Sequence, residues 1–234
     1  MDFDIRYYES VVSTMDIASD AAIANAYEGL VIQAGEQQSG RGRRGNQWTS
    51  PKGNLYQTIV LKPKVARQDW GQLSFVIAVA LAMAVLQADK FADIDLRLKW
   101  PNDVMINGKK LAGILIEAGA DYVLIGTGVN LEHAPDDRAR IQDFSRISLN
   151  SFRDIFLDAI STYYNLWQEK GFIPIRDLWM TFAFKKGQVI TANLKNQSIR
   201  GVFQNIDNSG SLILRSSDGE EHVITSSEII NWGQ

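Results

Sequence analysis

The chain has 234 residues, of which 45% are hydrophobic, 22% charged and 10% aromatic. This composition indicates an ordinary globular protein of one to two domains, and it excludes disordered, collagen-like and coiled-coil proteins. A net charge of −3 argues against a general nucleic-acid binder, because affinity for phosphate backbones requires an excess of basic residues. The absence of cysteine excludes disulfides, thiolate metal sites and a cysteine nucleophile, and with the polar first residues it predicts a cytoplasmic protein.

The first half of the chain alternates helical and strand patterns. Ser13 and Asp16 resemble a capping box, and the Ala-rich run after them predicts a helix to Tyr27. A second helix is expected over residues 71–88; its apolar stretch is shorter than the roughly 20 residues of a bilayer span, so we expect no membrane segment. The polar, glycine-rich residues 37–53 predict a loop. Strands are expected over residues 30–34, 55–61, 94–100, 104–106, 111–117 and 122–131.

Two details of these strands bear on function. Apolar and polar residues alternate over residues 94–100, which places Lys99 on the face away from the core. Asn107-Gly108 is a strong hairpin signal between two of the strands. Strands joined by hairpins, with helices before and after them, predict an α+β fold with a mixed β-sheet flanked by helices.

The second half ends in a pattern of short strands. Residues 132–150 predict a connection, and Ser151 with Asp154 predicts the start of a helix that ends near Gly171. Another helix is expected over residues 175–184. Four or five strands then predict a small barrel, with boundaries at residues 189–194, 199–206, 211–215 and 222–225. We therefore expect two domains, residues 1–186 and 187–234.

Three segments carry candidate chemistry. Residues 40–45 read Gly-Arg-Gly-Arg-Arg-Gly, but no helix follows them as a dinucleotide-binding loop requires, so their arginines suggest an anion site; a solvated basic loop is the alternative. Lys99 begins the run Lys-Trp-Pro-Asn-Asp at residues 99–103 and would be a fixed point charge, or simply an outward-facing lysine. Residues 126–130 read Gly-Thr-Gly-Val-Asn, where glycines allow close approach of a ligand or form a bulge.

Together these segments resemble the biotin protein ligase family. The resemblance rests on Ser13-Thr14, residues 37–45, Trp48 with Ser50-Pro51, residues 53–56, 99–103, 110–115 and 126–130, in that order and spacing. It covers roughly residues 9–131, and the trailing strands resemble the family's SH3-like C-terminal domain in architecture. The fold it implies is that of class II aminoacyl-tRNA synthetases and biotin ligases.

The resemblance implies a ligase that works in two steps. The carboxylate of biotin attacks the α-phosphorus of ATP to give biotinyl-5'-AMP and pyrophosphate; a lysine of a biotin carboxyl-carrier domain, of acetyl-CoA carboxylase or a related carboxylase, then displaces AMP. Joining two anions requires fixed cations at the transferring group, and Mg²⁺ is expected with ATP, although its ligands are not identified.

Residue roles follow from the same resemblance. The catalytic residues would be Lys99, Arg43 and Arg41. Those that bind biotin would be Ser13, Thr14, Gln37, Arg41, Gly42, Arg43, Lys99, Gly113 and Gly128. Those that bind ATP would be Arg44, Trp48, Asn102 and Asn130. Met15 stands where the common family pattern has asparagine, so the affinity for biotin is expected to differ from that of relatives.

Other functions are weighed against this one. Only 12 residues precede Ser13, too few for a helix-turn-helix, so we expect a short form without a DNA-binding domain and no specific DNA binding. Lipoate ligase is the nearest alternative enzyme, and a protein that binds biotin without turnover is the alternative that is not an enzyme. A thiol-dependent octanoyl transferase is excluded without cysteine. A homodimer is also considered.

Overall fold

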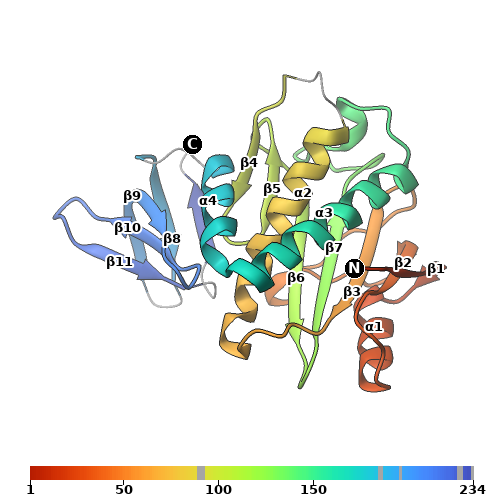
Figure 1. Ribbon diagram of the computed structural model, residues 1–234. Coiled ribbons are helices and arrows are strands. Elements are labelled where there is room, and N and C mark those ends of the chain that lie inside the picture. Colours follow the sequence, from red (N-terminus) through yellow and green to blue (C-terminus); the bar gives the residue numbers. More distant parts are fainter. Residues whose placement is uncertain (89–92, 184–186, 195–196, 226–228, 233–234) are drawn as a thin grey trace.

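The computed structural model describes residues 1–88, 93–183, 187–194, 197–225 and 229–232 (Figure 1). Seven strands form a mixed sheet in the order β1-β2-β3-β7-β6-β5-β4, in which only β1 and β2 run parallel. Their bounds are β1 Asp4–Val11, β2 Leu30–Gln37, β3 Leu55–Leu61, β4 Leu96–Lys99, β5 Asp103–Ile106, β6 Lys109–Ala118 and β7 Val123–Val129. The predicted α+β fold is confirmed.

Helices cover both faces of this sheet (Figure 1). On one face α1 (Thr14–Ile23) packs on a small apolar cluster that includes Leu30, Ile32 and Val60, while the alternate strand residues face the main core. That main core contains α2 (Leu73–Ala88), which packs against α3 (Leu149–Lys170). The opposite orientation of neighbouring strand residues follows from the two-residue period of a strand.

One helix of the described chain is long and apolar enough to cross a membrane. It comprises Arg67–Ala88, a 3₁₀ segment (Arg67–Gln72) followed by α2. In this fold 67% of its most apolar 18-residue stretch is buried inside the protein. A helix that is apolar all round is expected where protein covers it on every side, so α2 has the position of a core helix, as the sequence indicates.

Helix α1 is shorter than its sequence predicts. Ser13 is the N-cap and its Oγ accepts the Met15 amide at 3.3 Å, as expected. The carboxylate of Asp16 does not complete a capping box; it pairs with Arg41 instead. The helix ends at Ile23 rather than Tyr27 because Asn25 adopts a left-handed conformation with φ of 64°.

Helix α3 begins three residues earlier than the predicted cap. Ser148 is the N-cap, and its Oγ accepts the amide of Ser151 at 3.1 Å, so Ser151 itself lies in the first turn. Asp154 pairs with Arg153 rather than with the backbone. The helix ends at Gly171 as expected, and α4 (Phe172–Phe182) follows directly, earlier than the predicted residues 175–184.

The first sheet contains one strand that the sequence does not predict and one strand that is longer than predicted. β1 was not predicted, because five consecutive residues of this edge strand are exposed and show no alternation. β2 continues to Gln37, so Gln37 belongs to a strand and not to the loop. The predicted hairpin at Asn107-Gly108 is confirmed, with φ angles of 50° and 76° that suit a type I′ turn.

The second sheet contains five antiparallel strands in the order β11-β10-β9-β8-β12. Their bounds are β8 Val189–Asn193, β9 Ser198–Ile206, β10 Leu212–Arg215, β11 Glu221–Ile224 and β12 Ile229–Trp232. The small C-terminal β-structure is thus present, with the four or five strands that the pattern indicates. The proposed boundary after residue 186 stays a prediction, since residues 184–186 lie outside the described residues.

Candidate active site

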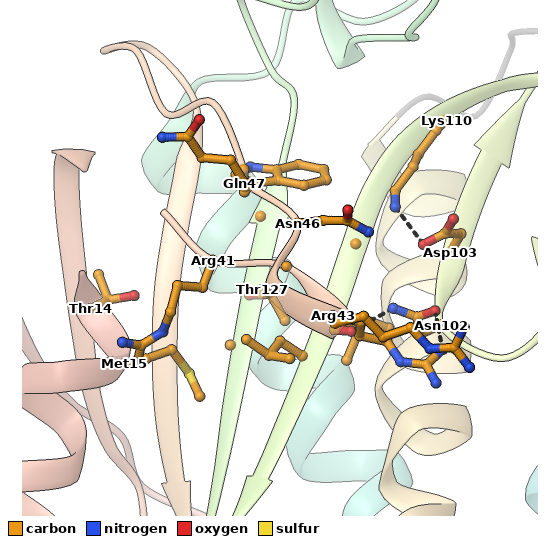
Figure 2. Close-up of a pocket in the computed structure, with 18 of the residues that line it drawn as sticks. Thr14, Met15, Arg41, Arg43, Asn46, Gln47, Asn102, Asp103, Lys110 and Thr127 are labelled. Carbon is orange, nitrogen blue, oxygen red and sulfur yellow. Dashed lines mark hydrogen bonds and ion pairs between the residues drawn. The ribbon is translucent and has the colours of Figure 1, made fainter. Parts of the chain in front are cut away.

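A cavity of about 670 Å³ opens where the first sheet, the start of α1 and the loop of residues 40–48 meet (Figure 2). Twelve of the thirteen residues predicted for the site line it: Ser13, Thr14, Gln37, Arg41, Gly42, Arg43, Arg44, Trp48, Lys99, Asn102, Gly113 and Gly128. Residues distant in the sequence therefore form one site, although the cavity alone does not assign their individual roles.

One end of the cavity is polar and uncharged. The Gln37 Oε1 accepts both the amide of Thr14 at 2.9 Å and its Oγ1 at 3.1 Å. Gln37 Nε2 donates to Ser50 Oγ at 3.0 Å, and Thr58 Oγ1 donates to Thr14 Oγ1 at 2.8 Å. Ser13 lies beside them, buried, at the helix cap. This network fixes hydrogen-bonding groups at one end of the cavity, as a small neutral polar ligand requires.

The floor of the cavity lacks side chains where two glycines pair across strands β6 and β7. A Cβ at Gly128 would lie 2.4 Å from Trp48 Nε1, and one at Gly113 would lie 3.1 Å from Trp48 Cζ3. Gly126 makes similar room for Met15, whose Sδ would be 2.8 Å from an added Cβ. The predicted close approach at the glycines is therefore made in this structure by the Trp48 ring.

Trp48 stands between the two ends of the site. Lys110 Nζ lies 5.3 Å from the centroid of its ring, within the range of a cation–π contact. Its indole Nε1 is buried and has no hydrogen-bond partner among the described residues. A buried donor without a partner is unfavourable, so this N–H is available to an acceptor atom of a ligand.

The arginines of the loop point in different directions (Figure 2). Arg41 extends toward α1 and pairs with Asp16 at 2.6 Å. Arg43 extends toward the β4–β5 turn, where its NH1 donates to Asn102 Oδ1 at 3.0 Å. Arg44 is exposed and has a positive φ of 56°, which is unusual for a residue other than glycine. Arg41 and Arg43 therefore extend to opposite sides of the cavity, and on the α1 side the charge of Arg41 is balanced by Asp16.

The other end of the cavity is cationic. Lys99 ends β4, and Lys110 near the start of β6 pairs with Asp103 at 2.6 Å (Figure 2). Arg138 lies in the connection after β7 and lines the cavity. Its backbone forms an isolated parallel β-bridge with the backbone of Lys110. With Arg43, these groups surround one region, so this is where the site would hold an anion.

Burial acts on two of these cations. It lowers the pKa of the Lys99 ammonium from its usual value; Asp103 opposes this shift, while Lys110 and Arg138 add to it. Burial likewise lowers the pKa of the Arg43 guanidinium, with Arg44 in the same direction and Asp103 against it. Binding of an anion stabilises the charged form of a partly buried cation more than that of a solvated one.

Asn130 is the predicted site residue that does not line the cavity. Its Nδ2 donates to the carbonyl of Ala139 at 3.0 Å, and its own carbonyl accepts the amide of Ile141 at 3.0 Å. These hydrogen bonds hold the connection after β7, which includes Arg138, against residue 130. Asn130 therefore supports the cavity wall in this structure, with one N–H of its side-chain amide directed to the returning chain.

Several lining residues were missing from the predicted set. Lys110 and Asp103 belong to segments quoted for the resemblance, and the β5–β6 hairpin would have brought both to the site. Arg138 carried no signal, since the polar connection showed no pattern. The remaining additions are Met15, Asn46, Gln47, Gln57, Trp100, Pro101, Ile114, Leu115, Gly126 and Thr127.

Comparisons with known proteins agree with this geometry. Residues 7–130 match the Biotin/lipoate A/B protein ligase family, and residues 187–232 match the Biotin protein ligase C terminal domain. The chain is 39% identical over 220 residues to biotin--[acetyl-CoA-carboxylase] ligase of Paracoccus denitrificans, covering 86% of this chain and 90% of the relative. It is 32% identical to the bifunctional ligase/repressor BirA of Bacillus subtilis, covering 91% and 70%.

Solved structures share the fold. Biotin protein ligase from Aquifex aeolicus in complex with biotin and ATP superposes with a TM-score of 0.86 at 23% identity, covering 98% of this chain and 99% of the other. The enzyme from Leishmania major in complex with biotinyl-5-AMP gives 0.66 at 24% identity, covering 95% and 98%. The sequence matches extend over both sheets. The chain therefore belongs to the biotin protein ligase family.

Proposed function

We propose that this chain is a biotin–protein ligase. Biotin's carboxylate oxygen attacks the α-phosphorus of ATP, a new acyl–phosphate bond forms, and pyrophosphate leaves. The amine of a carrier lysine then attacks the acyl carbon, an amide forms, AMP leaves with the bonding electrons, and the amine loses a proton. Neither step requires a covalent bond to the protein.

The division of the cavity carries this proposal. Thr14 and Gln37 at the uncharged end offer oriented hydrogen bonds to a compact polar ring, and Ser13 lies beside them. Arg43 and Lys99 stand at the cationic end, where a carboxylate and a phosphate would meet. Fixed cations in a partly desolvated site lower the barrier to joining two anions, because they need no reorganisation during the reaction.

Individual roles follow from this arrangement. We assign Ser13, Thr14 and Gln37 to the ring of biotin, and the backbone of Gly42, Gly113 and Gly128 to its chain. Arg43 and Lys99 would contact the carboxylate and the α-phosphate, and Lys110 would join them. Arg44, Trp48 and Asn102 would bind the nucleotide. Arg41 would bind biotin from the α1 side through its position beside Asp16, and Asn130 would act on ATP only through the chain that it holds.

Mg²⁺ would enter with ATP rather than occupy a resident site. No group of three or more His, Cys, Asp or Glu side chains gathers within the residues described. Asp103 is the acidic residue among those that line the cavity, and Mg²⁺ needs only one or two carboxylates when phosphates supply the other ligands. Asp103 fits that part once Lys110 turns to the phosphates.

The name of the relative from Paracoccus denitrificans supports a carrier domain of acetyl-CoA carboxylase, or of a similar carboxylase, as acceptor. We propose a cytoplasmic site of action. Edge strand β1, with Tyr7 57% exposed, supports a homodimer that sedimentation would detect.

We propose no specific DNA binding, since residues 4–11 form a strand and not a recognition helix. An operator-like footprint at moderate salt would contradict this.

The decisive assay is ATP–pyrophosphate exchange on the purified chain. We expect exchange that depends on biotin and falls sharply in Lys99→Ala and Arg43→Ala. Exchange driven by lipoate but not by biotin would establish a lipoate ligase instead. Tight binding of biotin without any exchange would establish a binding protein.

A further inference from the structure

The turn between β9 and β10, residues 207–211 (the 207–211 turn), contacts the domain that holds the cavity. Trp100 Nε1 donates a buried 2.9 Å hydrogen bond to the carbonyl of Gly210. Gln72 Nε2 donates to the carbonyl of Asn208 at 3.3 Å, and Arg176 NH1 donates to Asn208 Oδ1 at 2.8 Å. Three donors of the large domain therefore meet one short turn of the second sheet.

The 207–211 turn is itself firmly constrained. Asp207 Oδ1 accepts the amides of Ser209 and Ser211, each at 2.8 Å. Gly210 has a φ of +87°, and a Cβ there would lie 2.7 Å from Phe75 Cε2. Glycine is required because the backbone both adopts a left-handed conformation and lies against this ring. The turn thus presents the Gly210 carbonyl to Trp100 at a fixed place.

Trp100 belongs to the segment that supplies the cationic end of the cavity, residues 99–103 (the 99–103 segment). Its side chain is 1% exposed, and its neighbours Lys99 and Asn102 line the cavity. Ser74 Oγ, on α2, donates to the carbonyl of Pro101 at 2.8 Å. The segment is therefore held by α2 on one side and by the second sheet on the other.

We propose that the 207–211 turn, through Trp100, positions the 99–103 segment for the nucleotide. The inference rests on the proposed function and extends it, because it gives the second sheet a part in adenylate formation without any contact between that sheet and the substrates. Trp100 and Asp207 are positioning residues in this scheme. The uncharged end of the cavity, built on α1 and β2, lies outside the network.

Two variants test the contact from its two sides. Trp100→Phe keeps most of the aromatic volume and removes the indole N–H, and Asp207→Ala loosens the turn at a residue that is half-buried. Trp70→Phe is the matched control, since its indole donates to the carbonyl of Val65 at 3.2 Å and does not reach the 99–103 segment. Each variant is measured for KM of ATP in the exchange assay, for Kd of biotin by calorimetry, for melting temperature, and for hydrogen exchange of residues 99–103.

We expect Trp100→Phe to raise KM for ATP by about three- to tenfold, the effect of one neutral buried hydrogen bond, with Kd for biotin within about twofold. Asp207→Ala should also raise KM for ATP. In the double variant, the rise in KM should be smaller than the product of the two single rises. Hydrogen exchange of residues 99–103 should accelerate in both variants and not in Trp70→Phe.

Unchanged KM for ATP and unchanged hydrogen exchange in Trp100→Phe and Asp207→Ala, with only a lower melting temperature like that of Trp70→Phe, would overturn the proposal. Failure of the proposed function looks different, because the unaltered chain would then show no exchange at all. In that case hydrogen exchange of residues 99–103 still decides whether the contact holds the segment.

Discussion

Lys110 offers the sharpest test of the cationic end. Its Nζ lies 2.6 Å from Asp103 Oδ1, and the two side chains are 19% and 20% exposed. At an effective dielectric constant of about 20, a unit charge about 4 Å from the transferring phosphoryl group contributes about 4 kcal/mol. Water that enters the vacated space restores part of this. We therefore expect Lys110→Ala to lower the rate of biotin-dependent exchange by about 10²- to 10³-fold at saturating substrate.

The same substitution leaves the Asp103 carboxylate without its lysine partner beside the phosphates. Because Asp103 is also the carboxylate proposed for Mg²⁺, removing its charge should not restore the rate, and Lys110→Ala combined with Asp103→Asn should be no faster than Lys110→Ala alone. Lys109→Ala is the matched control, since Lys109 Nζ donates to the exposed carbonyl of Asp136. A Lys110→Ala rate within about threefold of the unaltered enzyme, or an equal loss in Lys109→Ala, would refute the reasoning.

Three further substitutions probe other parts of the molecule. Gly128→Ala would place a Cβ 2.4 Å from Trp48 Nε1, so tryptophan fluorescence and KM for ATP should change, unlike in Gly71→Ala, where a Cβ meets nothing within 4 Å. The exchange rate should decline at alkaline pH as Lys99 loses its proton. The decline should begin below the ordinary lysine pKa of 10.5, because burial lowers the pKa of Lys99. Lys99→Arg should move the decline to higher pH. Asn54→Ala removes the acceptor of the backbone amides of residues 131–133, and urea denaturation should show about 3 kcal/mol less stability; a loss under about 1 kcal/mol would contradict this.

The sequence was sufficient where local patterns decide the structure. Alternation placed Lys99 away from the core, and the observed strand buries Leu96 and Leu98 while Arg97 and Lys99 remain partly exposed. The hairpin at Asn107 and the end of α3 at Gly171 follow from backbone geometry that few residues adopt. Residues 41–44 of the glycine- and arginine-rich loop line the cavity, as expected for an anion site rather than for a solvated basic loop.

The sequence was insufficient where a distant partner decides the outcome. Asp16 could complete a cap or pair with a cation, and only the folded loop shows that Arg41 reaches it. Asn130 was expected at the nucleotide because its segment matches a family pattern, and only the fold shows that it does not line the cavity and that its side-chain amide donates to the carbonyl of Ala139. Arg138 reaches the cavity only because the chain after β7 returns to β6, a path that no local pattern encodes.

The distribution of charge explains how an acidic protein can serve two anionic substrates. The chain carries a net charge of −3, so its surface as a whole does not attract polyanions. The cavity is nevertheless lined by six cations and one acid, namely Arg41, Arg43, Arg44, Lys99, Lys110, Arg138 and Asp103. Since screening limits charges to roughly 8 Å at physiological salt, only a ligand small enough to enter experiences this excess. The attraction of small anions to the cavity therefore follows from where the basic residues lie, and not from how many there are.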